Sequence, residues 1–268
     1  MMNGLPGAHC LRIAALIAVI ATAASTRVAA QAFPDKVVEF IPGPSAGFGS
    51  GFYPPNVLGA PHGNANAQTP TFTEDHILSL GTGGVITLEF TEHQIVDGPG
   101  VDFTIFENPV EPIGLPEQSY VEAAVVAVSV DGETWHTFPF DIVSTAPSQL
   151  NKKANYIGFA GVMPSFSSPL NGISPFDPVV SGGDQFDLAD VGISGVRFIR
   201  ITDTGHPNYN PVYDADGDLV SDYGNLLDPV PGESAFSDTA GFDLDGIAAI
   251  HTEPYAPPSC ISHWQLYE

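Results

Sequence analysis

Cysteine and basic residues are scarce in this chain. Its 268 residues include two cysteines, seven lysines and arginines, and 31 aspartates and glutamates, which gives a formal charge of −24. A nucleic-acid partner is not expected, because phosphates are bound mainly by Lys and Arg. The same shortage argues against attraction to anionic membrane surfaces. Acidic surfaces favour solubility, but solubility does not explain why the acids cluster beside glycines. The composition suits a partner that is a cation.

Charged residues are absent from the apolar run at residues 13–24, which follows Arg12. The run is shorter than the roughly 20 residues that a membrane span needs, and the small residues near position 32 match a cleavage site. We therefore predict a signal peptide over residues 1–32, with a membrane anchor as the alternative. Residues 33–268 are predicted to form a single domain that is secreted, held at the cell surface or periplasmic. This part keeps five bases against 31 acids, a charge of −26.

Only one cysteine, Cys260, lies beyond the predicted signal peptide. No disulfide can therefore form within the exported chain, and another device must stabilise it. Bound calcium is the device that we expect. Free cysteines tend to be buried, so we expect Cys260 to be buried, with pairing between chains as the alternative.

No segment shows a sustained helical stripe, whereas 28 glycines and 25 prolines separate short apolar runs. This pattern predicts an all-β fold, an antiparallel β-sandwich of the jelly-roll kind with long loops rich in Gly, Pro and Asp. The glycine tract at residues 81–84 predicts a hairpin between strands over 76–80 and 85–90. Asp131-Gly132 predicts a second hairpin within residues 129–138. The valine-rich residues 121–130 are typical of a central strand.

Six motifs follow one another along the chain. They are LSLGTGGVITLEF (78–90), GPGVDFTIFEN (98–108), SVDGETW (129–135), GGDQFDLADVG (182–192), VRFIRITD (196–203) and GFDLDGIAAI (241–250). Together, over about residues 57–251, they resemble the domains of bacterial secreted "cell surface protein" sequences. Two of them, SVDGETW and VRFIRI, are also loosely similar to discoidin-type and galactose-binding-like jelly rolls. The resemblance implies a β-sandwich that binds sugars or surfaces and holds a structural calcium ion. Because no apolar helix and basic tail precede Glu268, we expect release or non-covalent attachment and no transmembrane segment in the mature chain.

Acidic residues in three of these motifs are candidate calcium ligands, because Ca²⁺ takes six to eight oxygen ligands. On a strand, Asp243 and Asp245 would point to one side, while Phe242 and Leu244 fill the other. We predict that some of these acids meet around one or two calcium ions. The alternative is that they cap loops or pair with arginines. The candidates are Asp102, Glu107, Asp184, Asp187, Asp190, Asp243 and Asp245.

A second, weaker candidate is the acidic loop at residues 214–222. Asp214, Asp216, Asp218 and Asp222 occupy positions 1, 3, 5 and 9 of a calcium-loop pattern. Leu219 stands where that pattern needs glycine and Asn225 where it needs glutamate, so a true EF-hand is not expected. A looser calcium loop and a solvated acidic turn remain the two interpretations.

Catalytic motifs are missing: the chain has neither a G-x-S-x-G elbow nor an H-E-x-x-H pair. We therefore expect a protein that is not an enzyme. The leading hypothesis is a secreted, calcium-stabilised binding module of the cell surface or extracellular matrix, with surface glycans or matrix components as the expected partners. One alternative is a secreted glycoside or polysaccharide hydrolase, for which Asp102 with Glu107, or Glu89 with Glu92, would be the carboxylate pair. The other is a structural envelope protein without a small-molecule ligand.

Overall fold

The computed structural model describes residues 33–222 and 239–255, so the predicted signal peptide and Cys260 lie outside the described residues. Within these ranges the regular elements are fifteen short strands and four 3₁₀ helices. None of these helices has the length and the apolar character that crossing a bilayer requires. The prediction of an all-β fold is confirmed. The 3₁₀ helices are η1 (Pro55–Val57), η2 (Pro147–Gln149), η3 (Lys153–Asn155) and η4 (Leu188–Val191).

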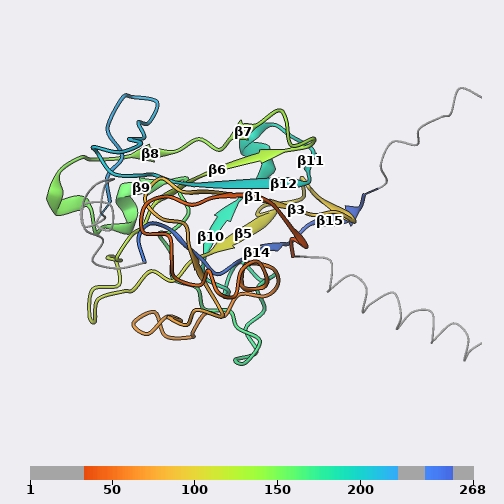
Figure 1. The fold of residues 1–268 in the computed structure, drawn as a ribbon, viewed down its shortest axis with the longest axis horizontal. Helices are drawn as coiled ribbons and strands as arrows, with labels where there is room; N and C mark the ends of the chain where they lie inside the picture. Colours follow the sequence, from red (N-terminus) through yellow and green to blue (C-terminus); the bar gives the residue numbers. More distant parts are fainter. Residues whose placement is uncertain (1–32, 223–238, 256–268) are drawn as a thin grey trace, which may run out of the picture. The chain divides into compact units, whose positions relative to one another are not determined.

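The larger sheet contains five antiparallel strands in the order β1-β3-β12-β6-β7 (Figure 1). Alternation along β3 turns Ile86 and Leu88 into the core. Strand β6 lies inside the sheet, as its valine-rich sequence predicts. Its pairing with β7 confirms the hairpin at Asp131-Gly132. The strands are β1 (Lys36–Ile41), β3 (Val85–Glu89), β12 (Phe198–Asp203), β6 (Ala124–Ser129) and β7 (His136–Thr137).

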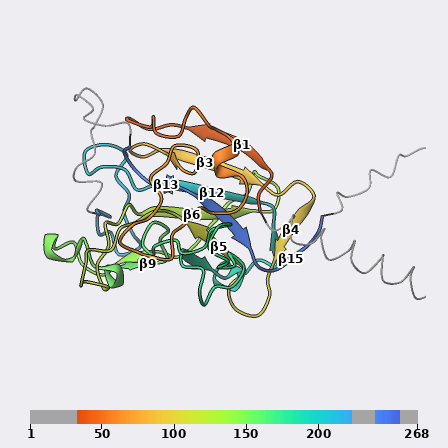
Figure 2. The same cartoon turned by 90° about the horizontal axis from the view of Figure 1, so that it is seen from below.

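A three-stranded antiparallel sheet, β10-β5-β14, faces the larger one. Three smaller groups complete the described fold: the sheet β11-β4-β15 and the pairs β13-β2 and β8-β9. Strands β4 and β15 lie at the opposite end of the domain from β9 (Figure 2). The bounds are β10 (Asp184–Phe186), β5 (Phe103–Phe106), β14 (Gly246–Ala249), β11 (Gly195–Val196), β4 (His93–Val96), β15 (Thr252–Pro254), β13 (Asp243–Leu244), β2 (Leu78–Ser79), β8 (Asp141–Ile142) and β9 (Tyr156–Ile157).

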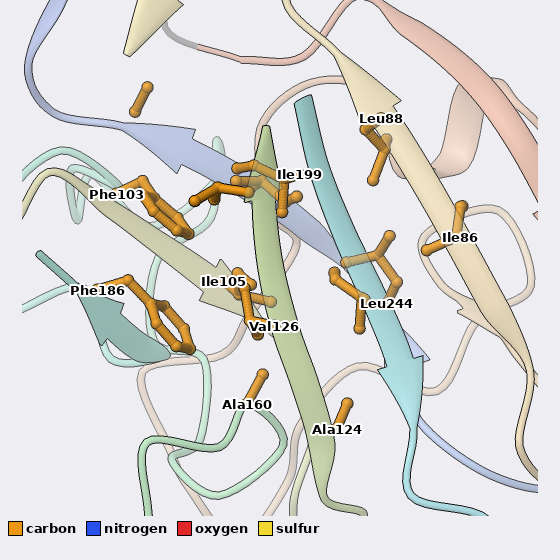
Figure 3. Packing of buried hydrophobic residues seen from close by; sticks show 14 of the residues in the cluster. Ile86, Leu88, Phe103, Ile105, Ala124, Val126, Ala160, Phe186, Ile199 and Leu244 are labelled. Atoms are coloured by element: carbon orange, nitrogen blue, oxygen red, sulfur yellow. The ribbon is translucent and has the colours of Figure 1, made fainter. Parts of the chain in front are cut away.

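Apolar side chains of the two facing sheets meet in one core (Figure 3). Phe103 and Ile105 of β5 project toward Leu88 of β3 and Val126 of β6. The rings of Phe103 and Phe186 stack with their centroids 5.2 Å apart. Removing this apolar surface from water supplies the main driving force for folding, at about 25 cal/mol per Å². The predicted packing of two antiparallel sheets is therefore confirmed.

A smaller apolar cluster anchors the long connection between β7 and β10. It joins Val121 and Ala123, just before β6, to the aromatic rings of Tyr156 and Phe159. The Tyr156 hydroxyl donates to the carbonyl of Leu150 at 2.8 Å. This cluster holds the loops beside the start of β6 in place, and one acidic side chain of the candidate site comes from that segment.

The predicted hairpin between residues 76–80 and 85–90 is wrong. Strand β2 pairs with β13, and β3 pairs with β1 and β12. The reason lies in the glycine tract, where Gly81 and Gly83 adopt positive φ angles of 77° and 68°. A side chain on Gly84 would start 2.0 Å from the Leu80 carbonyl oxygen. The tract therefore folds back too sharply to keep its flanking strands in register, and it sends the chain from one pair of strands to another sheet.

Candidate metal site and pocket

Glu107 stands directly after β5, and it is the most unusual acidic side chain in the described structure. The residue is 1% exposed. Among the described residues, neither of its carboxylate oxygens has a partner at hydrogen-bonding geometry. Buried polar groups are nearly always satisfied, and an ionised carboxylate in such a place is costly unless a cation neutralises it. The fold therefore places a carboxylate where a positively charged partner is needed.

Two further carboxylates lie next to Glu107. Asp243 comes from β13 and Glu122 from the segment before β6, and one oxygen of each of the three side chains lies within 4.8 Å of the others. Asp243 is 7% exposed and accepts a hydrogen bond from the Ser79 hydroxyl on the paired strand β2. The three side chains come from distant parts of the sequence, and the register of β13 on β2 sets where Asp243 lies.

The electrostatics of this group confirm that negative charge is crowded. Burial raises the pKa of Glu107 well above its ordinary value, and the charge of Asp243 adds to the increase. The backbone amides of Asn108 and Asp243 face the carboxylate and lower the pKa in part, although neither reaches hydrogen-bonding geometry. Burial also raises the pKa of Asp243 to about 7, against a hydrogen bond from Ser79 that lowers it. Without a cation, part of this group must hold protons near neutral pH.

The donor set fits a hard cation. All three side chains offer oxygen, and Ca²⁺ binds oxygen ligands at 2.3–2.6 Å, so ligands on opposite sides of one ion lie up to about 5 Å apart. The separation of at most 4.8 Å between the three carboxylates suits one shared ion. Zinc is a poorer match, because its sites use Cys and His, and neither residue type belongs to this group.

A cavity of about 380 Å³ opens above the three carboxylates, and we call it the central pocket. Its volume falls within the range of about 300–1,000 Å³ that is usual for small-molecule sites. Aromatic and aliphatic side chains form most of its wall. The rings of Phe72 and Tyr120 are 59% and 50% exposed. The lining residues are Phe48, Phe72, Ile77, Glu107, Asn108, Pro109, Val110, Tyr120, Glu122, Thr239 and Asp243.

Asp184 lies close to this group without lining the pocket. It sits on β10, opposite Ile105 of β5, and its charge contributes to the raised pKa of Glu107. Its carboxylate accepts hydrogen bonds from the amides of Val162 at 3.0 Å and Met163 at 3.2 Å. Burial raises the pKa of Asp184 to about 7 although these amides lower it. Asp184 therefore ties the 160–163 loop to β10 rather than facing the pocket.

Asp102, Asp187 and Asp97 form a second acidic group whose oxygens also lie within 4.8 Å of one another. Here the buried member has partners. Asp102 accepts hydrogen bonds from the amides of Gly98 and Leu188 and lies 2.8 Å from Nδ1 of His251. Asp187 caps η4 by accepting from the Ala189 amide. These contacts make the group a structural junction.

The other two members of the predicted set lie apart from both groups. Asp190 is exposed on η4. Asp245 is 2% exposed, and both of its oxygens accept from the backbone amide of His62, at 2.8 Å and 3.0 Å. The ring of His62 stacks on that of His76 at 3.9 Å. Asp243 and Asp245 therefore serve different sites although they are two residues apart.

The acidic loop at residues 214–222 is held mainly by its own backbone. Asp214 accepts hydrogen bonds from the amides of Asp216 and Asp218 at 3.1 Å and 2.9 Å. Burial opposes these bonds, but with the Ile142 amide they lower the pKa of Asp214. Asp216 and Asp218 are exposed. Asp222 is fully buried and accepts from the Ala123 amide at 2.7 Å, so it belongs to a different contact from the rest of the loop.

Sequence reasoning missed three acidic residues that the structure makes important. Glu122 was hidden in an apolar run, although it is the one carboxylate there, and that isolation is a usable signal. Asp203 ends β12 and accepts from the amides of Gly83, Gly205 and Phe242, joining three turns. Nothing in the sequence around Asp97 marked it as a candidate ligand except that a glycine follows it. The arginines do not pair with Asp243 or Asp245, since Arg197 pairs with Glu89 and Arg200 stacks on Trp135.

Comparison with known proteins adds little to this description. No protein-family model matches the chain, and no curated protein matches it. Among solved structures, the chain is similar to a fragment of a protein named as a chitobiase in Bacteroides thetaiotaomicron, with a TM-score of 0.33, 13% identity, and coverage of 82% of this chain and 90% of that one. It is also similar to the C-terminal domain of a chitobiase from Bacteroides fragilis, with a TM-score of 0.30, 10% identity, and coverage of 85% and 98%. Likeness at this level carries no argument about this chain.

Proposed function

We propose that the protein is a secreted module that binds Ca²⁺ through Glu107, Glu122 and Asp243 and uses that ion to bind a neutral carbohydrate in the central pocket. The observation that carries the proposal is the buried carboxylate of Glu107, which is 1% exposed and has no hydrogen-bond partner on either oxygen within residues 33–222 and 239–255. A divalent cation resolves both the crowding of charge and the missing partners. Export by the predicted signal peptide would carry the module out of the cytoplasm, where a bound ion can supply the cross-link that a chain with one cysteine after residue 32 cannot form within itself.

The charge balance favours a neutral ligand. Three carboxylates around Ca²⁺ leave a net charge of about −1, so an anionic ligand would be repelled within a partly buried site. The three carboxylates supply part of the six to eight oxygens that the ion takes. Neighbouring hydroxyls of a sugar are neutral oxygen ligands that can complete the shell from the open side of the pocket.

The wall of the pocket suits the other face of a sugar ring. Phe72 and Tyr120 expose flat apolar faces at 59% and 50%. Aromatic faces pack well against the C–H face of a ligand that is polar on its opposite side. A pocket with oxygen ligands at its floor and aromatic rings at its rim therefore matches an amphipathic ring such as a pyranose.

Calorimetric titration of the chelator-treated protein with Ca²⁺ tests the metal, with Mg²⁺ as the comparison. We expect one tight Ca²⁺ site that Glu107→Gln removes and that Glu39→Gln, an exposed acid on β1, preserves. Saturation-transfer NMR with methyl glycosides of neutral hexoses then tests the sugar. We expect transfer in Ca²⁺ that EGTA abolishes. Absence of Ca²⁺ binding in the wild type would exclude the proposal.

A secreted hydrolase is the second candidate, and the closeness of two glutamates favours it. Oxygens of Glu107 and Glu122 lie within 4.8 Å, and the carboxyl groups of retaining glycosidases are about 5–5.5 Å apart. The raised pKa of Glu107 would suit a general acid. Release of reducing sugar that Glu107→Gln abolishes and EGTA does not affect would favour the hydrolase over the binding module.

A further inference from the structure

The central pocket does not stand alone, because two smaller cavities adjoin it. We call the first the histidine pocket; it has a volume of about 290 Å³, and His62, Asn64, Thr71 and His76 are among its lining residues. The second, the amide pocket, has a volume of about 240 Å³, and Gln118 and Asn151 are among its lining residues.

The central pocket shares a lining residue with one of the smaller cavities, and a residue next in sequence to its lining contributes to the other. Tyr120 lines both the central pocket and the amide pocket. On the other side, Phe72 lines the central pocket while its neighbour Thr71 lines the histidine pocket. The side-chain amide of Asn108, on the floor of the central pocket, donates to the Thr71 carbonyl at 2.9 Å and fixes this partition. The amide pocket therefore shares the Tyr120 side chain with the central pocket, and the histidine pocket is joined to the central pocket through the adjacent residues Thr71 and Phe72.

The two flanking pockets differ from the central one in charge. Among the described residues, no Asp, Glu, Lys or Arg lines either of them. Amides and hydroxyls provide their polar groups, including Asn64, Ser168 and Asn171 on one side and Gln118 and Ser119 on the other. Such groups hydrogen-bond to hydroxyls without selecting a charge. The acids Glu111 and Glu117, which are close in sequence to the amide pocket, pair with Lys153 and Lys152 instead.

From this arrangement we propose that the site binds a neutral polysaccharide chain across three subsites, with the central sugar on the metal and its neighbours in the histidine and amide pockets. The proposal rests on the proposed function, because the central subsite is the one that holds Ca²⁺. It goes further in assigning two binding sites and in naming a polymer rather than a single sugar as the ligand. A peptide, whose carbonyl oxygens could also bind the ion, is the competing ligand that the test below distinguishes.

Chain length is the quantity that tests this proposal. The probes are neutral homo-oligosaccharides of hexoses, pentoses and N-acetylhexosamines with one, two, four and six residues, titrated by calorimetry in Ca²⁺. About one net hydrogen bond in each flanking pocket corresponds to about a tenfold gain in affinity per pocket. We therefore expect affinity to rise about 100-fold from one residue to four and then to level off, because the proposal provides three subsites.

Two variants separate the flanks from the centre. Asn64→Ala in the histidine pocket and Gln118→Ala in the amide pocket should each lower the hexasaccharide-to-monosaccharide affinity ratio about tenfold. Tyr213→Ala is the matched control, since Tyr213 is 55% exposed and lines none of the three cavities. It should leave the ratio unchanged.

The outcomes distinguish the two proposals. Equal affinity for all lengths, with Ca²⁺-dependent binding of the monosaccharide, would overturn the three-subsite proposal and leave the proposed function standing. Ca²⁺ binding without any saccharide binding, or binding of a hexapeptide library in place of saccharides, would overturn both the ligand part of the proposed function and the three-subsite proposal. Preference for galacturonate oligomers over neutral ones would overturn the assignment of a neutral chain.

Discussion

The substitution Glu107→Gln should stabilise the protein when calcium is absent and destabilise it when calcium is present. In the wild type, the Glu107 carboxylate is buried without a hydrogen-bond partner. Without calcium, the folded protein must either bury that charge uncompensated or hold a proton on it, whereas the neutral amide of glutamine avoids both costs and can donate toward Asp243. We expect the variant in chelator to be more stable than the wild type by about 1–3 kcal/mol, the usual cost of an unsatisfied buried polar group.

Calcium should change the order of the two proteins. A ligand that binds only the folded state at 100 times its dissociation constant adds about 2.7 kcal/mol to the free energy of unfolding. For a domain of this size, each kcal/mol raises Tm by about 2–4 °C. The wild type should therefore gain roughly 5–10 °C from calcium, whereas Glu107→Gln should gain little because it has lost a ligand.

Differential scanning fluorimetry in EGTA and in Ca²⁺ measures both effects, with Glu39→Gln as a control that should follow the wild type. The reasoning fails if EGTA leaves the wild-type Tm unchanged. It also fails if Glu107→Gln melts below the wild type in EGTA, because the carboxylate would then make a stabilising contact in the metal-free protein.

Three further predictions concern pH, the acidic junction and the core. In EGTA, the wild type should have a higher Tm at pH 5 than at pH 8. The folded state raises the pKa of Glu107, so it holds that proton more tightly than the unfolded state does. The resulting stability is fully present below the ordinary carboxyl pKa and is lost as pH rises through the raised pKa. Asp102→Ala should lower the free energy of unfolding by about 2–4 kcal/mol, because the buried Leu188 amide, the partly buried Gly98 amide and His251 lose their acceptor, yet the response to calcium should survive. Phe103→Ala should cost about 3–5 kcal/mol in urea unfolding, since the ring is fully buried.

Each of these predictions has a control. The pH response should be smaller in Glu107→Gln, and an equal response would show that other carboxylates cause it. Loss of the calcium shift in Asp102→Ala, in protein that remains folded by circular dichroism, would move the metal to the second acidic group. Phe52→Ala, at a ring that is 49% exposed, should cost less than about 1 kcal/mol. A cost similar to that of Phe103→Ala would contradict the assigned core.

The fold was largely readable from the sequence because its signals are local. Alternating apolar residues identify β3, and the valine run identifies β6 as an interior strand. The Asp131-Gly132 turn identifies its own hairpin because a two-strand turn is decided within a few residues. The glycine tract at residues 81–84 led to the wrong prediction of a hairpin, because glycine lets the chain reverse direction without determining which strands pair afterward.

The candidate site was readable only in part. Glu107 and Asp243 were expected among the ligands on the strength of their motifs, and the structure brings them together. Asp245 was expected beside Asp243, but the chain turns between β13 and β14, and its carboxylate binds the His62 amide instead. Glu122 carries no motif at all and enters the group through the packing of the loops before β6.

The sequence by itself determined the β-architecture, the charge of the surface, and which residue types were available to hold a cation. All three follow from periodicity and composition, which are properties of the chain that need no long-range contact. Only the tertiary structure decided which carboxylates share a space and which are satisfied by backbone amides. That choice depends on strand register and loop packing between residues more than a hundred positions apart, as for Glu107 and Asp243, and no local pattern encodes it.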